Sequence, residues 1–263
     1  MPETDLALLI DAAEQAGDIA RSFFQNDPCI TDKPGGAGPV TEADLAVNAR
    51  LEAILPAARP GYGWLSEETE DSSARLTTKR QFVIDPIDGT RAFINGSKDW
   101  AHALAVVENG VAVAAAVHLP MHGMMFAAAI GEGATLNGRS ISVTSAHMTT
   151  ATILASKPNY DPQLWKNGTV PEAKRAFRSS LAYRLCLVAQ GAFDGMLTLR
   201  PSWEWDIAAG ALIVQEAGGT VTDQKAAPLR FNNPHPQVPG VVASGPDLHR
   251  ALTTRLEPWN ANP

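Results

Sequence analysis

Two carboxylates stand three residues apart where an apolar run of the chain ends. Residues 82–84 are Phe-Val-Ile, Asp85 follows them directly, and Asp88 comes next in the segment Asp-Pro-Ile-Asp-Gly-Thr. An apolar run cut short by Pro and Gly is typical of a strand that enters a turn. One interpretation is purely structural, because Asp, Pro and Gly are common wherever a strand runs into a loop. The other interpretation is that the strand places two carboxylates at one end, where they can bind a hard cation.

Gly89 and Thr90 follow this pair and open a predicted short helical turn. The first backbone N–H groups of a helical turn have no partner inside it and favour an anion. Carboxylates that bind a cation, beside a turn that accepts phosphate, favour a metal-dependent phosphoryl-transfer site.

Further acids stand in three other segments of the chain. Glu67 and Glu68 form a pair in a turn-like segment, although solvated acid pairs are common. Asp206 precedes an apolar helical pattern, where a carboxylate can be an N-cap worth roughly 1 kcal/mol or a metal ligand. Asp44 stands three residues after Thr41, at the acidic position of a capping box. Spacing alone fits a cap and a catalytic role for Asp44 equally well.

Composition limits the classes of partner. The 263 residues include 28 acids and 21 bases, a net charge of −7, which argues against a nucleic acid polymer. Two cysteines without a CxxC motif fit a reducing compartment. We expect a cytoplasmic protein without a membrane segment, because no apolar run approaches the roughly 18–20 residues required and the first residues do not resemble a signal peptide.

Helical and strand patterns divide the chain near residue 150. Thr4 is placed to cap a first helix that runs to Phe23, and Thr41 a second that ends before Pro56. The Gly- and Pro-rich residues 33–39 are predicted to be a mobile loop. An antiparallel meander follows, with hairpin turns at Asn109-Gly110 and Asn137-Gly138, in strands 82–85, 103–107, 111–117 and 126–130.

Strands and helices alternate after residue 150. We predict strands 152–155, 195–199, 220–222 and 241–243, and helices 181–190, 207–217 and 247–256. The fold expected is an α+β or α/β layered sandwich, with a mostly antiparallel N-terminal sheet and a mixed C-terminal sheet. Two domains, 1–150 and 151–263, would hold the site between them.

Three acidic motifs in this order resemble the inositol monophosphatase family of magnesium-dependent, lithium-sensitive phosphatases. The motifs are Ser66-Glu67-Glu68, Asp85-Pro86-Ile87-Asp88-Gly89-Thr90 and Trp205-Asp206-Ile207-Ala208-Ala209-Gly210. Val40–Asp44 and Gln215–Gly219 fit the same pattern, so the resemblance covers nearly the whole chain. It implies a sugar-phosphatase-like arrangement of alternating helix and sheet layers.

The resemblance also implies a ligand set for two to three Mg²⁺ ions. Glu67, Asp85 and the carbonyl of Ile87 would hold the first ion, and Asp85, Asp88 and Asp206 the second. Only oxygen atoms are offered, which suits Mg²⁺ better than zinc.

Catalytic and substrate-binding roles follow from the same resemblance. Asp44 and Thr90, with Glu67, would orient the attacking water, and the backbone of Gly89 and Thr90 would hold the phosphate. The residues implied in substrate binding are Asp88, Gly89, Thr90, Arg184, Arg200 and Asp206. His102, His118 and His122 lie outside these motifs and are interpreted as structural.

Departures from the usual family motif bear on the substrate. Thr90 is followed by Arg91-Ala92-Phe93 rather than an Asn-Phe pair, and Arg184 and Arg200 resemble the 3'(2'),5'-bisphosphate nucleotidase branch. Trp203 or Trp205 is available as an apolar face for an adenine. Arg91 also occurs in histidinol-phosphatase motifs, so that activity and inositol-1-monophosphatase remain open. So does a non-catalytic regulatory module that binds metal and phosphate. The resemblance is compatible with a homodimer, and it leaves the role of Lys33 open.

Overall fold

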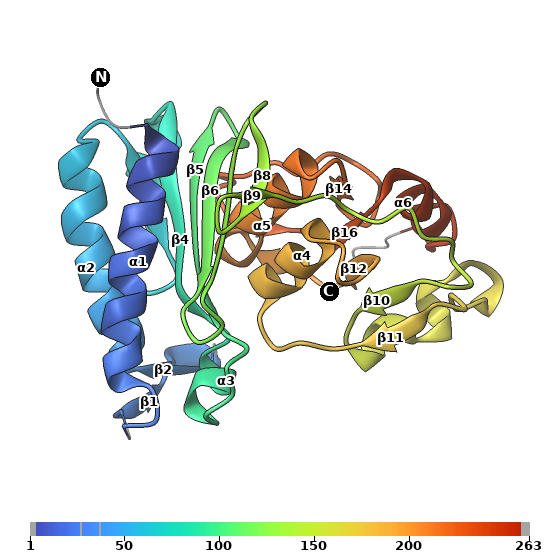
Figure 1. Cartoon of the computed structure of the whole chain (residues 1–263), viewed down its shortest axis with the longest axis horizontal. Helices are drawn as coiled ribbons and strands as arrows, with labels where there is room; N and C mark the ends of the chain where they lie inside the picture. Colours follow the sequence, from blue (N-terminus) through green and yellow to red (C-terminus); the bar gives the residue numbers. More distant parts are fainter. Residues whose placement is uncertain (1–3, 27, 37, 259–263) are drawn as a thin grey trace.

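The computed structural model describes residues 4–26, 28–36 and 38–258, which fold into alternating layers of helix and sheet (Figure 1). Helices α1 (Asp5–Phe23) and α2 (Glu42–Ala58) form one outer layer, and α6 (Pro246–Thr253) lies at the opposite end. Two sheets and a central helix layer lie between them. No helix in the described part of the chain is both long and apolar enough to cross a membrane.

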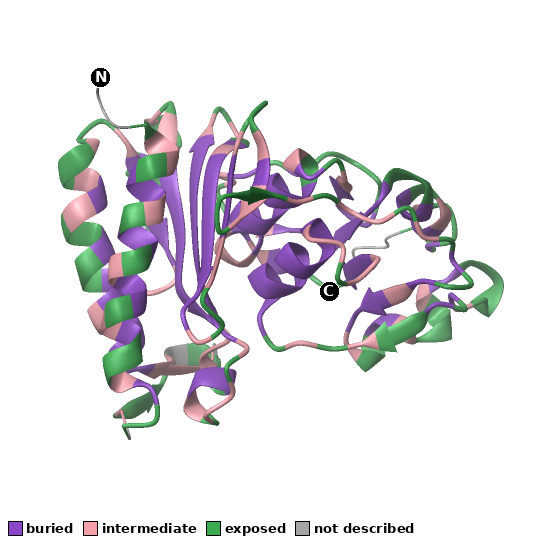
Figure 2. Cartoon of the chain, in the orientation of Figure 1, coloured by how far each residue is buried: buried purple, intermediate pink, exposed green. Residues whose placement is uncertain are grey.

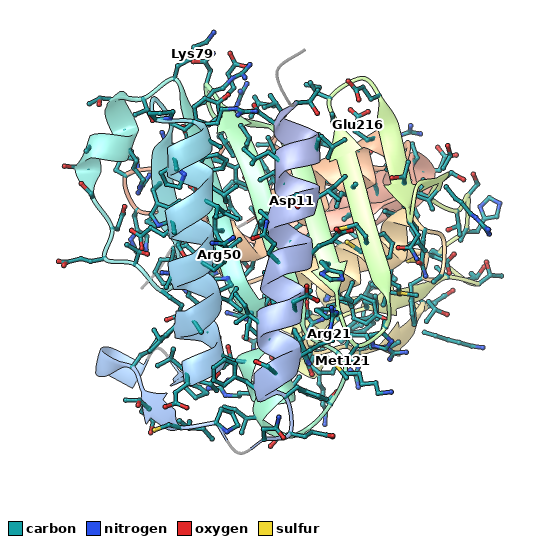
Figure 3. The ribbon with its side chains drawn as sticks, turned by 60° about the vertical axis from the view of Figure 1, so that its left-hand side comes forward. Asp11, Arg21, Arg50, Lys79, Met121 and Glu216 are labelled. Atoms are coloured by element: carbon teal, nitrogen blue, oxygen red, sulfur yellow. The ribbon has the colours of Figure 1, made fainter. Side chains whose placement is uncertain are left out.

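The outer helix pair covers one face of the first sheet. The Thr4 hydroxyl caps α1 by accepting from the Ala7 N–H, as the sequence predicted. Figure 3 shows the exposed side of this pair, where Arg50 of α2 donates to the side chain of Gln15, which in turn donates to Asp11. The prediction that α2 ends before Pro56 was wrong. Pro56 lies in the last turn and the helix continues to Ala58.

The first sheet has seven strands in the order β3-β4-β5-β6-β7-β8-β9. β3 is parallel to β4 and every other pair is antiparallel. Asn109 and Gly110 both adopt positive φ, as a two-residue hairpin turn requires. The short strand β3 was not predicted. The strands are β3 (Gly63–Ser66), β4 (Arg80–Asp88), β5 (Ala101–Glu108), β6 (Val111–Leu119), β7 (Met124–Ala129), β8 (Gly133–Leu136) and β9 (Arg139–Ser140).

A bulge interrupts β4 at the end that carries the acids. Asp85 pairs with Ala103 and Asp88 with Ala101, so three steps along β4 match two steps along β5. Bulges of this kind re-aim side chains and are frequent beside active sites. The strand therefore extends through Asp88, three residues further than the sequence predicted.

Helices α4 (Leu181–Ala189) and α5 (Glu204–Glu216) form the central layer between the two sheets. Both are buried along almost their whole length (Figure 2), and α5 contacts β4, β5, β6 and β7 as well as β14 and β16. Gly210 permits the close approach of α4, because a Cβ there would lie 2.6 Å from Cβ of Leu185. The helix begins at Glu204, three residues before the predicted start.

The second sheet has five strands in the order β11-β10-β12-β16-β14, with both parallel and antiparallel pairs. Its strands are β10 (Thr152–Leu154), β11 (Lys174–Ala176), β12 (Gly195–Thr198), β14 (Thr220–Thr222) and β16 (Val241–Ser244). The layered fold class, with a mostly antiparallel first sheet and a mixed second sheet, is confirmed. The division into domains at residue 150 stays a prediction.

Short elements complete the fold. The predicted loop 33–39 contains a 3-10 turn and enters a strand at Pro39, and residue 37 lies outside the described residues. α6 ends at Thr253 rather than 256, because Leu256 instead bridges to Trp165. The remaining elements are β1 (Ile30–Asp32), β2 (Pro39–Thr41), α3 (Thr90–Ile94), β13 (Ser202–Trp203), β15 (Gln237–Val238) and 3-10 turns at Pro34–Gly36, Ser73–Thr77, Lys157–Tyr160, Pro162–Leu164 and Lys166–Gly168.

Candidate active site

Three carboxylates from two separate elements meet beside the bulge. Asp85 and Asp88 come from the end of β4, and Asp206 lies in the first turn of α5. One oxygen of each lies within 4.8 Å of the others. Asp206 is not the N-cap that sequence spacing allowed, because Trp203 holds that position. Its carboxylate is therefore free of a capping role and joins the cluster.

Burial makes this cluster electrostatically unfavourable. Asp88 Oδ2 accepts from the Ser180 hydroxyl and the Ala182 N–H, both at 2.6 Å, yet burial still raises the pKa of Asp88 to about 6. Asp85 Oδ1 is buried without a hydrogen-bond partner among the described residues. Burial and the neighbouring charges of Glu67 and Asp88 raise its pKa well above the ordinary value. Burial and the charge of Asp88 do the same to Asp206.

A hard divalent cation fits this donor set. The three carboxylates repel one another, and one of them has a buried oxygen without a hydrogen-bond partner among the described residues. A positive charge that they share offsets this repulsion. The oxygen-only chemistry suits Mg²⁺. Asp85, Asp88 and Asp206 are therefore the residues that would hold it.

Glu67 approaches the same site from β3. Because β3 and β4 are parallel, they end at the same edge of the sheet, and the Glu67 N–H donates to the carbonyl of Ile84. Glu67 lines the pocket described below but does not belong to the group of three acids. Lys33 Nζ donates to Glu67 at 2.7 Å and to Glu68 at 2.6 Å. This places Lys33, whose role the sequence left open, directly on the acidic motif.

Asp44 lies in the capping box that its spacing allowed, and it also faces Thr90. Its Oδ2 accepts from the N–H of Thr41 at 2.8 Å and from the Thr41 hydroxyl. The Asp44 N–H in turn donates to the Thr41 hydroxyl oxygen at 3.4 Å, which completes a capping box. Its Oδ1 lies 3.2 Å from the Thr90 hydroxyl, which lies at the same distance from the carbonyl of Ile87. Burial raises the pKa of Asp44. The cap thus holds Asp44 rigidly while its second oxygen faces Thr90.

Gly89 forms the sharp entry into α3. Its φ is +103°, a left-handed conformation that favours glycine, and a Cβ there would lie 3.1 Å from the carbonyl oxygen of Asp99. The turn brings Gly89 and Thr90 to the pocket wall. The predicted short helix after the acidic pair is therefore present.

A pocket of about 420 Å³ opens over the carboxylates. Arg91, Arg184 and Arg200 supply its positive charge, and its lining also contains residues that the sequence analysis assigned to no site. These are Gly38, Pro39, Ala92, Ser156, Phe177, Ser179, Leu181 and Thr198. The signal for Phe177 was weak, because a lone aromatic residue in a loop has no pattern.

The arginines of the pocket are not engaged in ion pairs within the described part of the chain. Arg184 is buried, donates to the backbone carbonyls of Arg178 and Ser179, and lies 4.4 Å from the ring centre of Phe177. Burial lowers the pKa of Arg184 to about 10, so it remains charged at neutral pH. Arg200 is exposed. Trp203 and Trp205 stack on each other, and neither lines this pocket.

Comparison with known proteins agrees with this geometry. The model of the inositol monophosphatase family matches residues 1–258. The chain belongs to the inositol monophosphatase family. Its members are Mg²⁺-dependent phosphatases, so the enzyme class and the metal predicted from the acidic motifs are confirmed.

Relatives of this family cover almost the whole chain. A histidinol-phosphatase from Mycobacterium tuberculosis is 33% identical over 97% of this chain and 99% of its own length. A Nus factor SuhB from Salmonella typhimurium is 33% identical over 95% of each chain. The crystal structure of the extragenic suppressor protein suhB from Bartonella henselae superimposes with a TM-score of 0.80 at 26% identity, over 94% of this chain and 96% of that one. None of these names specifies the bisphosphate nucleotidase branch.

Li⁺ is expected to compete with Mg²⁺ for the carboxylate cluster. A small monovalent ion can bind Asp85, Asp88 and Asp206 but offsets less of their charge, and less of the charge of a leaving oxygen. We therefore expect millimolar Li⁺ to slow phosphate release at limiting Mg²⁺ and added Mg²⁺ to restore the rate. K⁺ at the same ionic strength is the control. Phosphate release that responds equally to both salts would contradict the prediction.

Proposed function

We propose that this phosphatase acts on a phosphate monoester that carries a second anionic group, best represented by a 3'(2'),5'-bisphosphate nucleotide. The observation that carries the proposal is the set of guanidinium groups in the pocket. Among the described residues, Arg184 is buried there with only backbone carbonyls as acceptors, and Arg200 faces the same space. Cations beyond those needed at the metal site favour a substrate with two anionic groups.

The ester phosphate is proposed to lie over the carboxylates. Glu67, Asp85, Asp88, Asp206 and the carbonyl of Ile87 would hold Mg²⁺. Mg²⁺ bound there supplies a lowered pKa for a neighbouring water and positive charge against the phosphate oxygens. The backbone N–H groups of Gly89 and Thr90 would hold the phosphate at the start of α3.

Asp44 and Thr90 are proposed to orient the attacking water. The water donates a hydrogen bond to the Thr90 hydroxyl as Thr90 donates to Asp44 Oδ1, which lies 3.2 Å away. The raised pKa of Asp44 makes it a better proton acceptor than an exposed carboxylate. As the oxygen–phosphorus bond forms, a proton passes to Asp44 through Thr90, the ester bond breaks, and the leaving oxygen takes a proton from solvent.

The second anionic group is proposed to bind Arg184 and Arg200, with the base against Phe177. Phe177 is a half-exposed aromatic residue of the pocket, and it already packs on the guanidinium of Arg184. It replaces Trp203 and Trp205 as the apolar face for a base. A hydrogen bond to a charged group contributes roughly 1.5–3 kcal/mol, or about one to two decades in kcat/KM.

Adenosine 3',5'-bisphosphate is expected to be a better substrate than inositol 1-phosphate. Arg200→Ala should lower kcat/KM for the bisphosphate by about 10-fold and leave inositol 1-phosphate within about 2-fold, because only the first has the second phosphate. Arg200 is exposed, so the variant should fold. Arg250→Ala, which removes an exposed cation of α6 paired with Asp247, is the control. Equal or better turnover of inositol 1-phosphate by the wild type would contradict the nucleotidase proposal and leave the phosphatase class unaffected.

Histidinol phosphate is the second candidate substrate, favoured by the M. tuberculosis relative, whose match spans 97% of this chain. This substrate carries an ammonium group, which the arginines of the pocket repel. Arg200→Ala should therefore improve histidinol phosphate turnover while it weakens the bisphosphate. The second candidate would be supported if the wild type prefers histidinol phosphate and Arg200→Ala does not increase its turnover.

A binding role without catalysis is the remaining alternative; the S. typhimurium relative is named Nus factor SuhB rather than a phosphatase. Hydrolysis of none of the three substrates with saturating Mg²⁺ would favour it. A homodimer stays a prediction.

A further inference from the structure

His102 lies behind the bulge that carries the metal-binding acids. It is in β5, completely buried, and its Nδ1 forms a short hydrogen bond with the carbonyl oxygen of Pro86. Pro86 is one of the two residues, with Ile87, that separate Asp85 from Asp88 in the bulge. Pro86 has no N–H to donate to β5, and its carbonyl oxygen is hydrogen-bonded to the side chain of His102 in that strand.

The hydrogen bond defines the tautomer of His102. A carbonyl oxygen can only accept, so Nδ1 must carry the proton. Burial lowers the pKa of His102 to about 3, which keeps the ring neutral. Trp100 contacts the ring edge-on at 5.5 Å between centres, and His118 lies 6.0 Å away on β6. The ring is thus fixed in place on the face of the sheet that α1 covers.

Holding one carbonyl fixes a whole peptide plane. The Pro86–Ile87 peptide is planar, so the direction of the Pro86 carbonyl also sets that of the Ile87 N–H on its opposite side. Asp85 and Asp88 flank this plane along the chain, and the Ile87 carbonyl, whose oxygen lies 3.2 Å from the Thr90 hydroxyl, follows directly. A rotation of the plane would change the spacing of all three oxygen donors.

We propose that His102 is a positioning residue, whose Nδ1–H holds the bulge of β4 so that Asp85, the Ile87 carbonyl and Asp88 are correctly spaced for a divalent cation. The role is exerted through the backbone, and His102 itself touches neither metal nor substrate. It concerns the metal site of the family and does not depend on which substrate is bound.

His118 provides a matched control within the same sheet. It pairs with His102 across β5 and β6, it is buried, and its Nδ1 also binds a backbone carbonyl, that of Ala13 in α1. The packing around it is tight, because a Cβ on Gly17 of α1 would lie 2.5 Å from its ring. His118 therefore has the same chemistry and is also buried, but its ring is hydrogen-bonded to α1 instead of the bulge.

The test is direct binding of Mn²⁺, followed by the loss of the electron paramagnetic resonance signal of the free ion. Asn places its amide nitrogen near the position of Nδ1, whereas Gln places it near Nε2. We expect His102→Gln to weaken Mn²⁺ binding by about 10-fold or more, and His102→Asn to remain within about 3-fold of the wild type. His118→Gln should also stay within about 3-fold, whatever it does to the melting temperature.

Three results would overturn the proposal. They are wild-type Mn²⁺ affinity in His102→Gln, an equal loss in His118→Gln, or a loss in His102→Asn as large as in His102→Gln. The first result would show that His102 has no role in metal binding. The second would show that any buried histidine of this sheet affects binding through general stability. The third would show that the hydrogen bond from Nδ1 is not the cause of the effect.

Discussion

Asp88→Asn is expected to lower kcat by roughly 10²–10³-fold while the protein stays folded. Asp88 would ligate the metal, and an amide is a neutral, weaker ligand. The loss corresponds to about 3–4 kcal/mol of charge stabilisation in the transition state. The amide carbonyl of the variant can still accept from Ser180 or Ala182, which now donate to the carboxylate. The expected effect is therefore on catalysis and not on folding.

Asp194→Asn is the matched control for this variant. Asp194 also accepts from a hydroxyl, that of Thr144, and from a backbone N–H, that of Thr152, but it lies outside the pocket. Steady-state phosphate release and thermal unfolding should be measured for both variants. An Asp88→Asn enzyme that keeps a third of the wild-type kcat would show that the site is misassigned.

Removal of Mg²⁺ is expected to abolish phosphate release and to leave a protein whose stability falls as the pH rises. The pKa of Asp88 is raised from an ordinary value of 3.8 to about 6. The folded state therefore binds more protons than the unfolded state between these values, and stability decreases across that window as the pH rises. From Asp88 alone the loss is about 3 kcal/mol, or roughly 6–12 °C in Tm for a chain of this size.

Mg²⁺ should cancel this loss, because it binds the charged carboxylates of the folded protein. At 100 times its Kd it contributes about 2.7 kcal/mol. We expect the increase in Tm on adding Mg²⁺ to be small at pH 5 and large at pH 8, measured by calorimetry with a chelator as the reference.

The variant Asp85→Asn distinguishes the contribution of the carboxylate cluster to the pH dependence of stability from that of other titrating groups. Hydrogen bonds from Arg75 lower the pKa of Asp71, and those from Lys79 and Arg80 lower the pKa of Glu108, so these acids stabilise the fold as the pH rises. They are unchanged in Asp85→Asn. The metal-free variant should be more stable than the wild type at pH 8 and respond less to Mg²⁺. A metal-free wild type that is the more stable of the two at pH 8 would refute the charge-repulsion account.

Local sequence patterns predicted the acids because each lies at the end of a recognisable element. Asp85 and Asp88 follow an apolar run, and Asp206 begins a helical pattern, so the direction of each element indicated where its carboxylate would lie. Thr41 and Asp44 carry the spacing of a capping box, which the structure contains. The contact between Asp44 and Thr90 required tertiary packing and came only from the family resemblance.

Features that depend on distant parts of the chain were not predictable in this way. Lys33 meets Glu67 and Glu68 across more than 30 residues of sequence, and Phe177 reaches the pocket from a loop. His102 was interpreted as structural, because the sequence around His102 contains no signal of a bulge in the neighbouring strand. Pro56 misled the prediction, since a proline in the last turn disturbs few helical hydrogen bonds.

The central position of α5 has a consequence for synthesis on the ribosome. A nascent chain that has emerged only to residue 150 contains all strands of the first sheet but neither helix of the central layer. The face of that sheet which α5 later covers carries Ala101, Ala103, Ala105 and Val107, all buried in the finished protein. Until α5 has emerged as far as Glu216, this apolar face is open to other nascent chains and to chaperones. A translational pause between residues 150 and 216 would lengthen that exposure.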